Sequence, residues 1–156
     1  MSSKNRHLVE KKTHVKKVLI LSNKNSKIFY ISKLYTGAKH DFGMLKAEFP
    51  NTVPWFEEFT LLLDSGFQGI DTLYKTKELK ITFKRRRAKK GQTNDLTPEQ
   101  VAHNKKVGSE RIFVEHAIGG LKRYRILYNR IRLKGDDTLN RIINAVAGLW
   151  NFSVDS

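Results

Sequence analysis

The chain has 156 residues, a length that suits one domain with a buried core. Lys and Arg number 30 against 15 Asp and Glu, and the resulting net charge of +15 predicts a polyanionic partner such as nucleic acid. The absence of cysteine excludes disulfides and thiolate zinc sites, and no long apolar run supports a membrane partner.

The N-terminal half begins with two β-rich runs at residues 15–21 and 27–32, separated by turn-forming residues at 22–26. This order predicts a β-hairpin. A helix is expected to start near Asp41, because Asp at an N-cap or in a first turn meets unpaired backbone N–H groups. Pro50 should stop this helix.

A short apolar run at residues 59–63 predicts a strand buried on both faces, as in a parallel or mixed sheet. Asp64 stands at its C-terminal end and is followed by a glycine-rich stretch that ends at Gly69. Residues 79–83 predict another strand. The C-terminal edge of a buried strand is where open α/β sheets place their chemistry.

A densely basic run at residues 84–90 precedes a helical C-terminal half. The stretch Thr97-Pro98-Glu99-Gln100 predicts a helix start, with a Thr cap, a Pro at the first helical position and a Gln three residues after the cap. This helix is expected to run past Glu115 towards Gly119, and a last helix should span about residues 138–152. The order of elements predicts an α/β domain with helices covering a mixed sheet.

Glu115 shares one helical face with Arg111 and Lys122, because an α-helix turns by about 100° per residue. One interpretation is a set of surface ion pairs, which stabilise a helix by only about 0.2–0.5 kcal/mol each. The other is a functional acid. The apolar neighbours of Glu115 should leave little of this helix to solvent, and a carboxylate in such surroundings needs a partner or a metal.

Asp64 also allows two interpretations. An Asp that closes a strand before Ser-Gly often only shapes a turn. Its functional interpretation is a metal ligand on a rigid strand. A carboxylate pair such as Asp64 and Glu115 suits Mg²⁺ or Mn²⁺, and two such ions could clamp the attacking and leaving oxygens of a phosphodiester.

Three stretches of the chain carry a family resemblance. Residues 61–69, which read Leu-Leu-Leu-Asp-Ser-Gly-Phe-Gln-Gly, resemble the second-aspartate motif of DDE transposases of the IS5 type. Residues 111–125 resemble their glutamate motif, with Arg, Glu and Lys at the matching positions, and residues 37–41 match their Gly-x-x-His-Asp turn. Where the family often has Tyr, three residues before the Arg, this chain has Gly108. The likeness covers roughly residues 14–152.

The resemblance implies an RNase H-like fold and metal-dependent cutting and joining of DNA at transposon ends. Asp64 would be the second metal-binding acid and Glu115 the third, with Mg²⁺ or Mn²⁺ as the cofactor and two ions in the complete domain. Arg111 and Lys122 would contact DNA near the scissile phosphate. Asp41 recurs in the family without being one of the three acids, and we expect it to cap its helix.

The first aspartate of the family has no counterpart here. Glu10 is the only acid before Asp41, and its surroundings do not resemble that motif. The first, central strand would then be absent from a partial catalytic domain at residues 14–156, which follows a basic segment at residues 1–13. We expect weak metal binding, no strand transfer by this polypeptide alone, and two strand edges open to another chain.

Two histories fit such a domain: a split gene completed by an upstream transposase fragment, or a decayed remnant. The active form should be oligomeric, and the chain should be a cytoplasmic, nucleoid-associated prokaryotic protein. Two rival functions remain open. One is a non-enzymatic basic DNA-binding protein, and the other is a regulatory fragment that binds DNA or the intact transposase.

The basic residues form two clusters that are expected to contact the DNA backbone, which positions DNA without reading its sequence. A solvated loop is the plain alternative for the first cluster. The first cluster lies in a loop at residues 84–96 and consists of Lys84, Arg85, Arg86, Arg87, Lys89 and Lys90, and the second includes Arg123 and Arg125.

Neutralising the first basic cluster, residues 84–90, to Gln is expected to flatten the salt dependence of DNA binding. Each phosphate contact releases condensed counterions, so each lost contact lowers the slope of log affinity against log salt by about 0.9 on duplex DNA. Fluorescence anisotropy over a salt series measures this slope. An unchanged slope would reject the contact.

Overall fold

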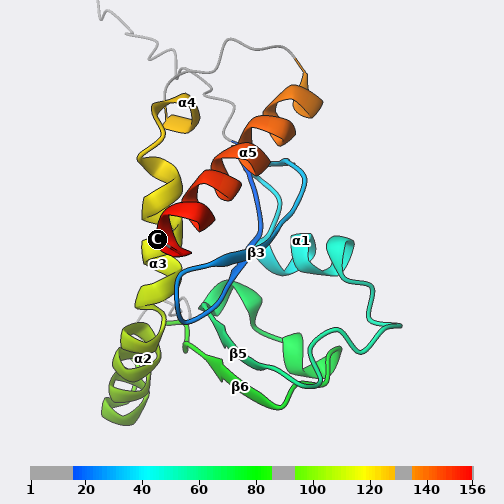
Figure 1. Ribbon diagram of the computed structural model, residues 1–156. Coiled ribbons are helices and arrows are strands. Elements are labelled where there is room, and N and C mark those ends of the chain that lie inside the picture. The colour runs from blue at the N-terminus through cyan, green and yellow to red at the C-terminus, as the bar shows by residue number, and fades with distance from the viewer. Residues whose placement is uncertain (1–15, 86–93, 129–134, 156) are drawn as a thin grey trace, which may run out of the picture.

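The computed structural model describes residues 16–85, 94–128 and 135–155 and shows a mixed α/β arrangement (Figure 1). The strands are β1 (Lys16–Lys17), β2 (Ile20–Ser22), β3 (Ile28–Ile31), β4 (Tyr35–Thr36), β5 (Thr60–Leu63) and β6 (Glu78–Ile81). The helices are α1 (Asp41–Glu48), α2 (Pro98–Glu110), α3 (Ile112–Lys122), α4 (Arg125–Tyr128) and α5 (Asp136–Asp155). Two 3₁₀ turns, η1 (Ser65–Phe67) and η2 (Ile70–Thr72), follow β5.

The strands of the described residues pair two by two. β2 and β3 form an antiparallel hairpin with Ile20 opposite Ile31, and β1 pairs antiparallel with β4. β5 lies parallel to β6, with Leu63 opposite Ile81. The hairpin and the two later strands are therefore confirmed, and so is the mixed α/β class.

Local signals place the helix starts. The Thr97 side chain accepts a hydrogen bond from Gln100 N at 3.2 Å, and Thr97 N donates to the Gln100 side chain at 3.1 Å, which completes the predicted capping box of α2. α1 begins at Asp41 and ends before Pro50, as expected. α5 extends beyond its predicted limits at both ends.

The prediction of one continuous helix from residue 97 past Glu115 is wrong. The segment forms two helices, α2 and α3, which meet at Arg111. Arg111 has φ −83° and ψ −2°, and its N–H is shared between the carbonyl oxygens of Val107 and Gly108. A ψ near zero lies at the edge of the helical region and interrupts the hydrogen-bond ladder. Gly108 weakens the last turn of α2, since glycine is a poor helix former.

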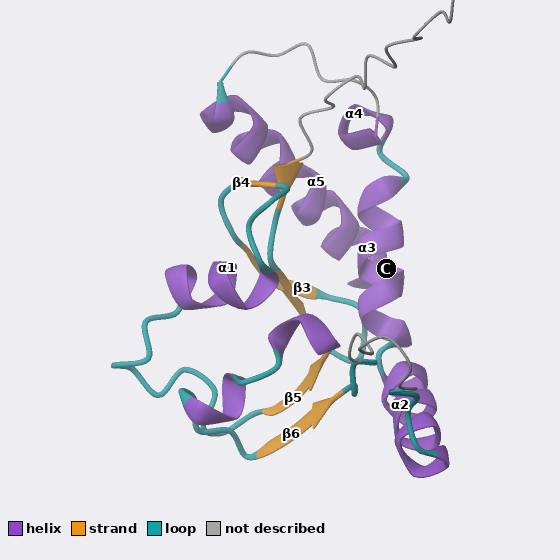
Figure 2. Ribbon diagram, turned by 180° about the vertical axis from the view of Figure 1, so that it is seen from behind, coloured by secondary structure: helices purple, strands orange, loops and turns teal. Residues whose placement is uncertain are grey.

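Two apolar clusters form the core, and the β2–β3 hairpin contributes to both. The first cluster lies between the hairpin, α1 and the β5–β6 pair, and the second lies between the hairpin, α3 and α5 (Figure 2). The buried members of the first are Leu19, Leu45, Phe49, Phe56, Ile70 and Tyr74. Those of the second are Ile28, Ala117, Leu121, Val146 and Ala147. The hairpin thereby connects the part of the molecule that contains α1, β5 and β6 with the part that contains α3 and α5.

Glu48 ties the end of α1 to the strands. Its carboxylate accepts hydrogen bonds from the hydroxyl groups of Tyr30 on β3 and Tyr35 on β4. Burial and the bonded carboxylate raise the pKa of Tyr35 to about 12, and the same causes raise the pKa of Tyr30. α1 is therefore fixed against the hairpin at its C-terminal end.

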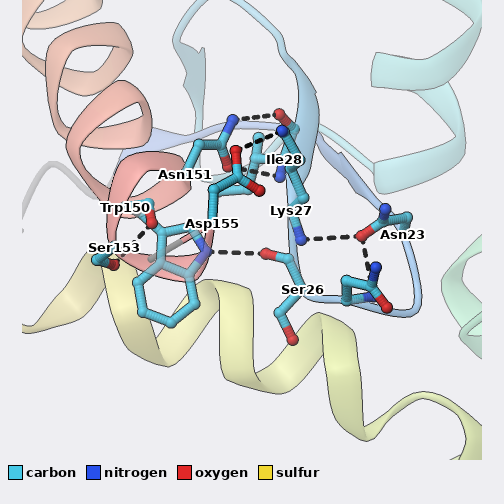
Figure 3. Close-up of polar contacts among 9 residues, drawn as sticks. Asn23, Ser26, Lys27, Ile28, Trp150, Asn151, Ser153 and Asp155 are labelled. Atoms are coloured by element: carbon cyan, nitrogen blue, oxygen red, sulfur yellow. Dashed lines mark hydrogen bonds and ion pairs between the residues drawn. The ribbon is translucent and has the colours of Figure 1, made fainter.

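Asparagine side chains occupy the outer edges of two strand pairs. Asn151 of α5 accepts a hydrogen bond from Ile28 N and donates one to Ile28 O, each 2.8 Å long (Figure 3). Asn104 of α2 accepts from Phe83 N at 2.7 Å and donates to Phe83 O at 3.0 Å, just beyond β6. On each outer edge, a side-chain amide bonds where a further strand would otherwise pair.

The inner edges of β2 and β5 have no partner strand in the described part of the chain. Leu63 O accepts a hydrogen bond from Thr82 N on the β6 side, so the backbone of Leu62 faces the opposite edge. The prediction that this run is buried on both faces is wrong, because Leu61, Leu62 and Leu63 are only half-buried. The open inner edge leaves them partly exposed.

Helices α3 and α5 approach each other closely at Gly120. A Cβ on Gly120 would lie 2.2 Å from the Trp150 ring, whereas a Cβ on Gly119 would have no neighbour within 4 Å. The Trp150 ring is held by a 2.8 Å hydrogen bond from its Nε1 to Ser26 O (Figure 3). Only glycine therefore fits at position 120.

Gly120→Ala is expected to lower the free energy of unfolding by about 1–3 kcal/mol, because the added methyl group overlaps a ring that is fixed in place. Gly119→Ala is the matched control and should raise this free energy by about 0.5–1 kcal/mol, since alanine loses less backbone entropy in a helix. Urea unfolding measures both. Equal stability of the two variants would contradict the close packing.

Candidate active site

Asp64 directly follows β5 and opens the turn that leads to Gly69. Its Oδ1 accepts a hydrogen bond from Gly66 N at 2.7 Å, and its carbonyl oxygen accepts one from Phe67 N at 3.1 Å. The turn-forming role is therefore present. The side chain is exposed, so the same carboxylate is also accessible at the C-terminal end of the strand.

Glu115 lies in the first turn of α3, with its side chain 63% exposed. Its Oε1 is 3.8 Å from Arg111 Nη2, so the predicted ion pair is present and long. The expectation that this helix leaves little to solvent is wrong, since Ile112 and Phe113 are also exposed. The reason is that a single face of α3, formed by Ala117, Gly120 and Leu121, is buried.

An ion pair joins β6, the strand beside β5, to the end of α2, the helix that precedes the one carrying Glu115. Lys80 of β6 donates a 2.7 Å hydrogen bond to Glu110, the last residue of α2, and this bond lowers the pKa of Glu110 and raises that of Lys80. β5 and β6 end in register, so Asp64 follows the strand next to this junction. Glu115 lies about one helical turn beyond it. Figures 1 and 2 both show β5 directed towards the place where α2 and α3 meet.

Glu115 also lines an open cavity of about 420 Å³ between α3, α5 and the turn of the hairpin. His116, Arg123 and Trp150 line the same cavity, and the Arg123 guanidinium lies 5.9 Å from the centre of the Trp150 ring. Asp64 is not one of the lining residues. The two acids therefore do not open into this cavity together.

The described residues do not complete a site for a divalent metal ion. Asp64 and Glu115 offer the carboxylate oxygens that Mg²⁺ prefers. Within residues 16–85, 94–128 and 135–155, however, no group of three or more His, Cys, Asp or Glu side chains is placed to hold a metal ion. Mg²⁺ demands near-octahedral coordination, and these two side chains supply only part of it.

The basic residues that were expected to bind DNA differ in exposure. Lys122, Arg123 and Arg125 are exposed around the end of α3 and the start of α4. Arg111 is different, since its side chain is 20% exposed and its buried Nε has no hydrogen-bond partner among the described residues. Arg85 pairs with Asp95 at 2.5 Å. Lys84 is exposed, whereas Arg86, Arg87, Lys89 and Lys90 lie outside the described residues.

Asp41 has surroundings that the sequence did not predict. The N-cap of α1 is His40, and no side chain caps this helix, so Asp41 occupies the first turn, one of its two expected positions, whereas the capping role expected for it is wrong. Its Oδ1 lies 3.4 Å from Lys17 Nζ, and its Oδ2 lies 2.9 Å from the position that a Cβ on Gly66 would occupy. The available sequence signal was that Asp41 and Gly66 both fall in stretches that resemble family motifs.

Comparison with known proteins decides the family. A sequence model described as DDE superfamily endonuclease matches residues 3–151, which include Asp64 and Glu115. The chain belongs to the DDE superfamily endonucleases. It is 30% identical over 140 residues to a protein described as a probable transposase for insertion sequence element IS702, from Microchaete diplosiphon. That alignment covers 90% of this chain and 46% of the relative, so this DDE endonuclease chain spans about half the length of the curated relative that it matches. No solved structure matches the chain.

Family membership confirms the resemblance that the motifs carry. DDE superfamily nucleases generally use divalent metal ions. Among the described helices of this DDE endonuclease chain, none is long and apolar enough to cross a membrane.

Proposed function

We propose that this chain is the C-terminal part of the catalytic domain of an IS5-type transposase, which cuts DNA at transposon ends and joins the ends to a target. The observation that carries the proposal is the family match over residues 3–151, which takes in both motifs. The net charge of +15 suits a DNA partner. A cytoplasmic, nucleoid-associated prokaryotic protein follows from this proposal.

The proposed fold is RNase H-like, with a first, central strand that the described residues do not include. The outer edges of β3 and β6 are bonded to asparagine side chains, whereas the inner edges of β2 and β5 lack a partner strand among the described residues. Both inner strands pack against the first apolar cluster. One further strand between them would unite the two pairs in a single mixed sheet. That strand would come from residues outside the described part of the protein, or from a second polypeptide such as an upstream transposase fragment or an intact transposase.

Amide hydrogen exchange tests the open edges. We expect the backbone N–H of Ile20 and of Leu62 to exchange faster than those of Leu21 and Leu61, because alternate residues of a strand face opposite edges. Exchange measured by NMR at low protein concentration gives all four rates. Strong protection of Ile20 and Leu62 at every concentration would show that the edges are already paired within one chain.

In the proposed site, Asp64 and Glu115 are the second and third acids of the complete domain. There they would hold Mg²⁺ or Mn²⁺, and the ion would supply Lewis-acid stabilisation of the phosphodiester oxygens. Lys122 is exposed on α3 and would contact DNA near the scissile phosphate together with Arg111. The two basic clusters would contact the DNA backbone farther away. Because the donor set is incomplete, this polypeptide alone should bind metal weakly and transfer no strand.

A second candidate function is that of a basic DNA-binding protein, or of a regulatory transposase fragment without catalysis. Two contacts favour it. Asp64 is bonded to Gly66 N, and Glu115 is paired with Arg111, so each acid already has a local partner.

Calorimetric titration with Mn²⁺ separates the two functions. We expect weak binding by the wild-type protein and at least about tenfold weaker binding by Glu115→Gln and by Asp64→Asn, because each variant loses a charged oxygen ligand. Glu99→Gln is the matched control on the exposed first turn of α2 and should bind as the wild type does. If all three variants bind Mn²⁺ with the same affinity, Asp64 and Glu115 serve only local structure, and the second candidate function is supported.

A further inference from the structure

The first turn of α1 lies against the segment that carries Asp64. Asp41 Oδ2 is 2.9 Å and Asp64 Oδ1 is 3.6 Å from the position that a Cβ on Gly66 would occupy. Phe42, the next residue of α1, has its Cε1 3.8 Å from the corresponding position on Gly69. Two consecutive residues of α1 thus meet two glycines of one turn.

Both glycines suit this close approach. At 2.9 Å, a side chain on Gly66 would overlap the Asp41 carboxylate, and Gly69 has φ +89°, which residues with side chains rarely adopt. The backbone of the turn can therefore approach α1 closely. Gly66 N in turn donates the 2.7 Å hydrogen bond to Asp64 Oδ1. Asp41 thus lies beside the residue whose N–H orients the candidate catalytic acid.

Lys17 offsets part of the negative charge around Gly66. The carboxylates of Asp41 and Asp64 flank the same glycine, and like charges at short range repel each other. Lys17 Nζ lies 3.4 Å from Asp41 Oδ1 and 3.4 Å from the carbonyl oxygen of Lys39. This contact anchors Asp41 from the strand side and offsets part of the repulsion.

We propose that Asp41 is a positioning residue for Asp64, acting through direct contact with Gly66. The catalytic meaning of this role rests on the proposed function, whereas the coupling between Asp41 and the turn does not. A simpler explanation is that Asp41 serves only α1, because a carboxylate in a first helical turn interacts favourably with the helix dipole.

The test compares Asp41→Ala and Asp41→Asn with a closely matched control, Asp136→Asn. Asp136 also lies in the first turn of a helix, and it pairs with Lys16, the neighbour of Lys17, at 3.0 Å. The measured quantity is the amide exchange rate of Gly66 divided by that of Lys80 on β6, whose N–H faces β5 as that of Thr82 does, so that a change common to the turn and the strand pair cancels. It requires neither metal nor DNA.

We expect Asp41→Ala to raise this ratio about fivefold, the effect of weakening one hydrogen bond, and to weaken Mn²⁺ binding as well. Asp41→Asn keeps an oxygen against Gly66 and should restore the wild-type ratio, and Asp136→Asn should leave it unchanged. An unchanged ratio in Asp41→Ala would overturn the proposal. So would an Asn variant as labile as the Ala variant, because charge rather than contact would then sustain the turn. Failure of wild-type protein to bind Mn²⁺ would count against the proposed function alone.

Discussion

Helix α2 is joined to the end of strand β6 by three of its side chains, and the position of the candidate site depends on this junction. His103 and Asn104 bond to the backbone of Ile81 and Phe83, and Glu110 bonds to Lys80. Because these contacts are spread along the helix, they fix both its position and its rotation about its own axis. α3 follows after a single residue, so the same bonds also fix where the helix that carries Glu115 begins.

Each candidate acid has a local partner, and magnitudes decide what this means. A solvent-exposed ion pair contributes only about 0–1 kcal/mol, and a neutral hydrogen bond contributes a similar net amount. Such contacts are readily exchanged for a stronger one when a cation or a nucleic-acid backbone arrives. The hydrogen bond at Asp64 and the ion pair at Glu115 are therefore the contacts that these side chains make when no cation or nucleic acid is bound. They are compatible with a catalytic role in a larger assembly.

Features encoded within a few residues could be predicted from the sequence. The capping box at Thr97, the turn between the first two runs and the helix stop at Pro50 are all of this kind. The exposure of β5 could not be predicted, because an apolar run carries no information on how many strands pair with it. The contact between Asp41 and Gly66 joins residues from different elements, and the break at Arg111 depends on a backbone angle that no spacing reveals. The two acids themselves were identifiable because the family motifs are long.

The bonds between α5 and the hairpin, described above for Asn151, have a consequence for the order in which the molecule folds. Asn151 and Ile28 are separated by 123 residues, and Lys27 and Asp155 by 128. The ribosome therefore releases the hairpin long before the helix that covers it. Until α5 has been synthesised, the apolar side of the hairpin stays exposed on the nascent chain, where chaperones or other polypeptides have time to reach it.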